Sequence, residues 1–171
     1  MSHHPPAPTG PAEWDPRLDL RLERIVTVTP EQLWSGWTSP HLLTRWFTPA
    51  PWVTVAAEVE PVPGGIFRTV VRSPDGDEND GAGCVLAAEP GRRLVWTNAL
   101  GPGFRPVELD EGDFPFTVEL AFTPVTGGTG TTYLAVARHG TAATAAAHDR
   151  MGFHDGWGAA LDQLLAVLAG T

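Results

Sequence analysis

The sequence predicts an α+β fold in which a curved antiparallel sheet of six to seven strands wraps around one long C-terminal helix. Residues 138–168 place apolar or small side chains at helical spacing, whereas the preceding segments alternate in the manner of strands. Two short helical segments interrupt the strands once, directly after the first strand. Because an amphipathic helix must cover its apolar stripe, the sheet is the surface on which we expect the terminal helix to lie.

Length and composition favour a single domain. The chain has 171 residues, of which 42% are hydrophobic and 18% charged, as is typical of a globular protein. Residues 1–17 are rich in proline and predict an extended or disordered tail. We therefore expect one domain over residues 18–171.

The charge balance excludes several classes of partner. The net charge is −9, and all 11 basic residues are arginine. With no basic patch to neutralise phosphates, we expect neither a nucleic-acid partner nor binding to an anionic membrane. No apolar run is long enough to span a membrane and the N-terminus lacks a signal-peptide pattern, so a cytoplasmic location is expected. The single cysteine, Cys84, lies in an apolar run and is expected to be a small buried side chain.

The N-terminal half begins with a strand at residues 19–28. Thr29 and Pro30 then predict the start of a helix, with Thr29 as N-cap and Pro30 in the first turn. Ser39 and Pro40 predict a second helix that ends near Phe47. A start of one strand followed by two helices excludes a simple barrel or sandwich.

Six more strands are predicted at residues 52–60, 66–72, 82–88, 93–97, 115–123 and 131–138. An acidic loop, residues 99–114, separates the last two from the others. The side chains expected to face the terminal helix, with the register left open at two places, are Phe67, Thr69, Val71, Val85, Trp96 or Val95, Val118, Leu120, and Leu134 or Val136.

The terminal helix has two unusual lines of residues. Gly152, Gly156 and Ala160 stand four apart, which indicates either a close approach or a bend, since glycine lowers helix propensity. The adjoining line carries large side chains, at Met151, Phe153, His154 and Trp157. Such a line suits the wall of a cavity as well as a solid core, and both interpretations stay open.

Several short motifs, in order, resemble the START-like (SRPBCC) helix-grip superfamily, and within it the family similar to the activator of the heat-shock-protein-90 ATPase. The likeness covers about residues 19–169 and lies in TPEQLW (29–34), WTSP (37–40), RWF (45–47), PGGIFR (63–68), PDG (74–76), GCV (83–85), PGRRLVWT (90–97) and MGFHDGW (151–157). The last motif resembles bacterial members described as polyketide-cyclase-like. The sequence departs from the family pattern at Phe47, where a second tryptophan is usual, and in the long acidic segment 99–114.

The resemblance implies a helix-grip fold but no single activity, because this fold hosts several functions. One implied role is that of a co-chaperone-like activator of a heat-shock chaperone ATPase. Another is that of a cyclase or hydrolase of the polyketide-cyclase type.

No metal or catalytic motif stands out from the residues themselves. His148 and His154 are six apart, which on one helix is about 240° at roughly 100° per residue, so they would point to different faces. Residues 75–86 resemble a calcium loop only superficially, because Asp80 and Leu86 occupy the positions that require glycine and glutamate. A solvated acidic hairpin tip at residues 75–81 is the expectation, and neither a metal nor a cofactor is predicted.

The polar candidates for a cavity are Arg68, His139 and His154, with Glu119 and Tyr133 as further options. For His154 three interpretations remain: a polar group that lines the cavity, a structural histidine, or a catalytic base.

The aromatic side chains favour binding over catalysis, and no catalytic residue is assigned. We expect a hydrophobic or aromatic small molecule between sheet and helix, in stress response or secondary metabolism, with a homodimer as an option. The predicted cavity residues are Trp46, Phe47, Trp52, Phe67, Arg68, Trp96, His139, Met151, Phe153, His154 and Trp157.

Overall fold

The computed structural model describes residues 14–170, and its main layer is a seven-stranded antiparallel sheet. Its strands run in the order β1-β9-β8-β5-β4-β3-β2. They are β1 (Asp19–Val26), β2 (Val53–Val59), β3 (Ile66–Arg72), β4 (Glu78–Glu89), β5 (Arg93–Thr97), β8 (Phe116–Pro124) and β9 (Thr131–His139). A small second sheet pairs β6 (Leu100–Gly101) with β7 (Arg105–Pro106) around the 3₁₀ turn η1 (Pro102–Phe104).

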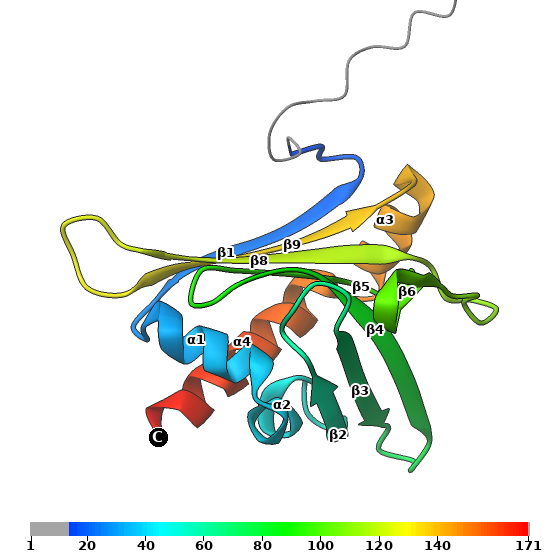
Figure 1. The fold of residues 1–171 in the computed structure, drawn as a ribbon, viewed down its shortest axis with the longest axis horizontal. Helices are drawn as coiled ribbons and strands as arrows, with labels where there is room; N and C mark the ends of the chain where they lie inside the picture. Colours follow the sequence, from blue (N-terminus) through cyan, green and yellow to red (C-terminus); the bar gives the residue numbers. More distant parts are fainter. Residues whose placement is uncertain (1–13, 171) are drawn as a thin grey trace, which may run out of the picture.

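Three helices cover one face of this sheet, and a fourth lies at its end. α1 (Pro30–Thr38), α2 (Pro40–Trp46) and α4 (Phe153–Ala169) lie on the concave side, whereas α3 (Ala142–Arg150) follows β9 at one end (Figure 1). The predicted α+β helix-grip architecture is confirmed. Most of the expected tail falls on residues 1–13, which lie outside the described residues.

The start of α1 follows from its sequence. The Thr29 hydroxyl accepts a hydrogen bond from the Gln32 backbone N–H (3.1 Å), and the Gln32 side chain accepts one from the Thr29 N–H (2.9 Å). This reciprocal capping satisfies two backbone donors that a helix otherwise leaves unpaired. Pro30 occupies the first turn, where its missing N–H costs nothing.

α1 and α2 pack closely on α4. A Cβ atom added to Gly36 would lie 2.5 Å from Cδ1 of Leu164, so a larger residue at this crossing would force the Leu164 side chain to move. The Gln163 side chain donates to the carbonyls of Trp46 (2.9 Å) and Thr48 (2.8 Å) and accepts from the Ala50 N–H (3.0 Å). Gln163 therefore ties α4 to the segment that follows α2.

Pairing between strands decides which side chains face the helices. Trp96 of β5, rather than Val95, belongs to the core on the helix side. In β9 the same face carries Tyr133 and Ala135, which stand opposite Phe122 and Leu120 of β8. The expectation of Leu134 or Val136 was wrong by one residue, because the period of a strand is two and the sequence pattern left this register open. Cys84 is fully buried, as predicted.

The C-terminal segment is not one continuous helix. β9 extends through His139, because its residues pair with both β1 and β8. The Thr141 hydroxyl then caps α3, and the helix ends before Gly152, whose φ of +92° is a left-handed conformation that favours glycine. α4 starts afresh at Phe153. The prediction of a single helix from residue 138 was therefore wrong, and the bend that the glycines indicated lies at Gly152.

The acidic hairpin between β3 and β4 is more regular than expected. Residues 75–81 were predicted as a solvated tip, yet β4 begins at Glu78. Arg72 pairs with Glu78 (2.6 Å) and Arg68 pairs with Asp80 (2.8 Å) across the two strands. Because these pairs are exposed to solvent, they contribute little to stability. Among the described residues, no helix is long and apolar enough to cross a membrane.

Candidate functional site: an aromatic pocket under the sheet

A hollow of about 310 Å³ lies where α1, α2 and the junction of α3 and α4 meet the concave face of the sheet. We call it the aromatic pocket. Its size falls at the lower end of the range that small-molecule sites occupy in proteins. Its walls come from three parts of the chain, which the next paragraphs take in turn.

The wall formed by α1 and α2 is a group of packed rings. The indoles of Trp37 and Trp46 meet edge to face, with centroids 4.8 Å apart. Phe47 lies edge-on to Trp37 at 5.9 Å. Since both tryptophans are more than nine-tenths buried, this wall is rigid and almost wholly apolar.

The sheet contributes Trp96 of β5, Phe116 of β8 and Tyr133 of β9. The Trp96 ring stacks on Phe67 at 4.4 Å and meets the edge of Phe116 at 6.0 Å. Complete burial raises the pKa of Tyr133 well above its ordinary value, so its hydroxyl stays protonated. Tyr133 therefore gives the apolar wall one neutral polar group.

Small residues on α4 create the space. Gly156 and Ala160 line the pocket, and a Cβ added to Gly156 would meet only Pro49, at 3.9 Å. The large side chains of Phe153 and Trp157 flank them, with centroids 5.2 Å apart. The small residues that the sequence analysis singled out therefore border a hollow.

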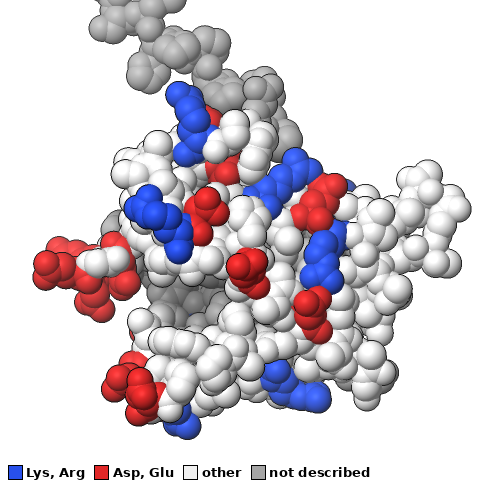
Figure 2. Space-filling model, turned by 180° about the vertical axis from the view of Figure 1, so that it is seen from behind, with Lys and Arg blue, Asp and Glu red and all other residues white. Residues whose placement is uncertain are grey.

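A second hollow of about 480 Å³ adjoins the first. The two share Phe47, Trp96, Phe116, His148 and Met151. We call the second hollow the acidic pocket, because its wall includes four carboxylates: Asp80, Glu108, Asp110 and Asp113. Figure 2 shows the face of the molecule hollowed beside a group of acidic side chains. A ligand of the aromatic pocket would therefore meet negative charge on this side.

A pair of histidines connects the pocket wall to the sheet. His148 of α3 lines both hollows, and its Nδ1 lies 2.8 Å from Nε2 of His139 on β9. Nδ1 of His139 in turn lies 2.9 Å from the carbonyl oxygen of Leu18. Burial, with a smaller contribution from His139, lowers the pKa of His148 to about 4, so its ring is neutral near pH 7.

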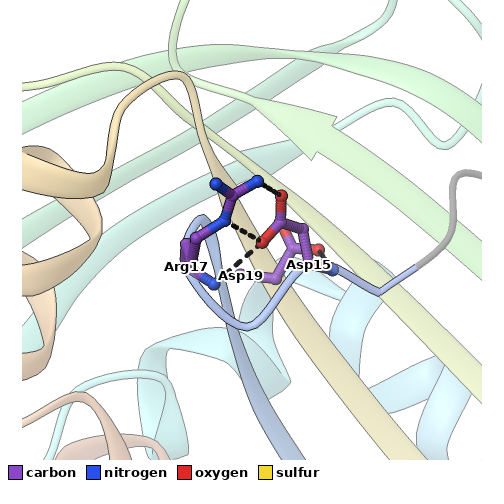
Figure 3. Close-up of polar contacts among 3 residues, drawn as sticks. All are labelled: Asp15, Arg17 and Asp19. Carbon is purple, nitrogen blue, oxygen red and sulfur yellow. Dashed lines mark hydrogen bonds and ion pairs between the residues drawn. The ribbon is translucent and has the colours of Figure 1, made fainter.

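Hydrogen bonds that involve Asp15, Arg17 and Asp19 hold the turn before β1 (Figure 3). The Asp15 carboxylate accepts hydrogen bonds from the backbone and side chain of Arg17, which lower the pKa of that carboxyl. The Asp15 N–H donates to the Asp19 carboxylate (2.9 Å), and the Asp15 carbonyl accepts from the N–H groups of Leu18 and Asp19. The N-terminal turn thus orients the Leu18 carbonyl, which accepts the hydrogen bond from His139.

The structure brings together seven of the eleven predicted cavity residues. The walls of the two hollows contain Trp46, Phe47, Phe67, Trp96, Met151, Phe153 and Trp157, although Met151 is 74% exposed.

The other four predicted residues do not line either hollow. Arg68 pairs with Asp80, and the Trp52 side chain is exposed. His139 lies behind His148, and His154 is exposed, with Nδ1 3.3 Å from the Asp149 carboxylate.

The sequence reasoning missed His148, Trp37 and Phe116 as pocket residues. Trp37 belongs to the hydrophobic core as well as to the pocket wall. Phe116 could have been predicted as a pocket residue, because it stands at the start of the strand next to β5. No signal in the sequence separated His148 from His154, because both were placed on one uninterrupted helix.

The arrangement can hold an apolar molecule but offers few reactive groups. Within residues 14–170 no three His, Cys, Asp or Glu side chains converge in a way that could hold a metal ion. The indole N–H groups of Trp37 and Trp96 are buried; that of Trp96 completes no hydrogen bond with a described residue, whereas that of Trp37 interacts with the Tyr133 hydroxyl. His148 and Tyr133 are the polar side chains that remain for recognition.

The fold and the pocket define a helix-grip protein, a class in which a curved sheet closes over a terminal helix. Residues 27–169 match the family model described as activator of Hsp90 ATPase homolog 1-like protein (AHSA1), and the chain belongs to that family. No curated protein sequence matches the chain.

Solved structures agree with this assignment. Protein NE0264 from Nitrosomonas europaea is 37% identical, with a TM-score of 0.85 over 92% of this chain and 97% of its own. A protein from Rhodobacter sphaeroides is 30% identical, with a TM-score of 0.75 over 94% and 97% of the two chains. The AHSA1 protein from Silicibacter pomeroyi is 22% identical, with a TM-score of 0.64 over 88% and 97%, and shares the fold.

Proposed function

We propose that this protein binds a hydrophobic, aromatic small molecule in the aromatic pocket. The observation that carries the proposal is the pairing of a rigid aromatic wall, centred on Trp37 and Trp96, with the small residues Gly156 and Ala160 opposite. A planar ring placed there would contact rings on two sides. Offset or edge-on contacts of this kind add about 0.5–1.5 kcal/mol each to the burial of apolar area.

The expected affinity sets the design of the test. A bicyclic aromatic molecule that buries about 200 Å² gains roughly 5 kcal/mol at about 25 cal/mol per Å². A free energy of that size corresponds to a Kd of roughly 0.2 mM. Binding must therefore be measured at ligand concentrations that approach the millimolar range.

The experiment compares two leucine substitutions on α4. Gly156→Leu places its side chain in the aromatic pocket, whereas Gly158→Leu places the same side chain where nothing lies within 4 Å of the new Cβ. Both variants gain helix propensity, so both are expected to fold.

Titration of naphthalene by isothermal calorimetry is expected to give a measurable Kd for the unmodified protein and for Gly158→Leu, and no heat for Gly156→Leu. If the two variants bind naphthalene equally well, the proposal is contradicted. It is also contradicted if neither naphthalene nor any other aromatic probe tested binds to the unmodified protein.

The other roles inferred from the sequence stay predictions. Activation of a chaperone ATPase is suggested by the family description alone. A cyclase or hydrolase would need a base, and a histidine with a pKa near 4 lies well below the value that suits proton transfer at neutral pH. The cytoplasmic location and the homodimer also rest on the sequence analysis.

A further inference from the structure

We propose that His148 acts as a hydrogen-bond acceptor that selects neutral, hydroxylated aromatic ligands. This inference rests on the proposed function, because it concerns which aromatic molecules the pocket prefers. It assigns a specificity-determining role to a residue on α3 that belongs to both hollows.

The hydrogen bonds fix the orientation of protons in the histidine pair. The Leu18 carbonyl only accepts, so Nδ1 of His139 must carry the proton in that 2.9 Å contact. One proton lies between the two rings, and Nδ1 of His148 donates it to Nε2 of His139 across 2.8 Å. A His148 ring that is neutral near pH 7 and carries its proton on Nδ1 has a lone pair and no proton on Nε2.

Nε2 of His148 makes no hydrogen bond with any other described residue, so its lone pair is available. The ring is held among three phenylalanines: the centroids of Phe116, Phe153 and Phe114 lie 5.0, 5.3 and 5.4 Å away. An acceptor in such apolar surroundings interacts strongly with a matching donor and is costly to leave unpaired. A ligand hydroxyl supplies that donor, whereas a hydrocarbon does not.

The charge of the neighbouring hollow disfavours anionic ligands. The acidic pocket, which shares His148 with the aromatic pocket, presents the carboxylates of Glu108, Asp110 and Asp113. None of these three forms an ion pair with another residue in the described part of the chain. A carboxylate on the ligand would meet like charges and an accepting nitrogen, so a neutral hydroxyl is preferred to an acid.

Four naphthalene derivatives separate the possible contributions: naphthalene, 1-naphthol, 1-methoxynaphthalene and 1-naphthoate. Isothermal calorimetry at pH 7.5 gives a Kd for each with the same protein. We expect 1-naphthol to bind about 5- to 10-fold more tightly than naphthalene, the difference that one hydrogen bond makes. The methoxy compound, which cannot donate, is expected to match naphthalene, and 1-naphthoate is expected to bind more weakly than either.

Two substitutions test whether His148 causes the preference. His148→Asn places an amide nitrogen near the position of Nδ1, so it can still donate to His139 but loses the acceptor in the pocket. His148→Gln places an amide oxygen near the position of Nε2, so it keeps the acceptor. The preference for 1-naphthol over naphthalene is expected to vanish in His148→Asn and to persist in His148→Gln, while both variants still bind naphthalene.

The outcomes distinguish this inference from the proposed function. If naphthalene and 1-naphthol bind the unmodified protein equally, or if His148→Asn keeps the preference, the role of His148 is wrong and the proposed function stands. If 1-methoxynaphthalene binds as tightly as 1-naphthol, the ligand oxygen accepts rather than donates, which overturns the inference. If none of the four probes binds, the proposed function fails and this inference fails with it.

Discussion

Nε2 of His139 and Nδ1 of His148 lie 2.8 Å apart, and this contact joins the last strand of the sheet to the helix that borders the pocket. His139 is the last residue of β9, and His148 lies nine residues further along the chain, in the last turn of α3. Through His139 the contact continues to the Leu18 carbonyl, which the N-terminal turn orients. The N-terminal turn and β9, which are far apart in the sequence, therefore both help to determine where the ring of His148 lies.

The histidine pair predicts a pH dependence of stability. The pKa of His148 is lowered from 6.5 to about 4 in the folded protein, by burial first and by His139 second, while Asp149 opposes the shift. Between these two values the unfolded chain binds a proton that the folded protein does not, so stability is complete above about pH 6.5 and declines as the pH falls toward 4.

Thermal unfolding followed by circular dichroism between pH 7.5 and 5 tests this expectation, in a range where most carboxyl groups remain ionised. The loss of Tm in the unmodified protein should be smaller in His148→Asn, which has no group that titrates there. The control variant, His154→Asn, changes an exposed histidine and should leave the pH profile as it is. A profile for His148→Asn that parallels that of the unmodified protein would contradict the pKa shift.

The crossing of α1 and α4 predicts a steric effect at Gly36. In Gly36→Ala the new Cβ would lie 2.5 Å from the fully buried Leu164, and overpacking of this kind destabilises by about 1–3 kcal/mol. Gly158→Ala adds the same methyl group where nothing lies within 4 Å and should stabilise by about 0.5–1 kcal/mol. Urea unfolding measures both, and a Gly36→Ala protein as stable as the unmodified one would show that the helices are less closely packed.

The hydrogen bonds of Gln163 predict that its substitution lowers the stability of the protein more than substitution of its neighbour Asp162. Gln163→Leu removes the partner of two carbonyls and one N–H in the segment after α2, which should destabilise by about 1–3 kcal/mol. Asp162→Asn breaks an exposed pair with Arg24 and should cost less than about 1 kcal/mol. For a chain of this length, differential scanning calorimetry should then show a fall in Tm of about 2–4 °C per kcal/mol, and the reverse order of the two variants would refute this assignment.

The left-handed conformation at Gly152 predicts that any other residue at this position would be strained. Because its φ is +92°, Gly152→Ala should destabilise by about 1–2 kcal/mol and should favour a different angle between α3 and α4. Gly140→Ala is a suitable control, because Gly140 has an ordinary φ and open space around its Cα. Urea unfolding and the affinity for naphthalene should both change in Gly152→Ala alone, and unchanged values in that variant would rule out a role for the break.

Local signals predicted much of the fold, and the clearest are the residues at which the first two helices begin. Thr29 with Pro30, and Pro40 after Ser39, mark two helix starts that the structure reproduces. The alternation in the strands predicted the number of strands in the main sheet and their approximate bounds, but it missed the small sheet of β6 and β7 within the segment predicted as a loop. It did not give the register of β9, because hydrophobic residues stand at both alternating sets of positions and a shift of one residue exchanges the two faces.

The pocket was only partly predictable, and Gly152 is the reason. A helical projection assumes a constant 100° per residue, and the left-handed conformation at Gly152 resets the phase between α3 and α4. Across the break, His148 faces the hollows whereas His154 points outward beside Asp149. Within α4, Phe153 and Trp157 line the pocket as the spacing indicated, whereas His154, predicted beside them, does not.

The most direct test of an aromatic ligand under the sheet is the indole region of a ¹H–¹⁵N correlation spectrum, in which each of the seven tryptophans gives one signal. Trp→Phe variants assign the signals. On titration with 1-naphthol, the signals of the four tryptophans of the aromatic pocket, Trp37, Trp46, Trp96 and Trp157, should shift together and saturate with one Kd. Those of Trp14, Trp34 and Trp52 should not move. A titration that shifts only these three signals, or none of the seven, would contradict the account.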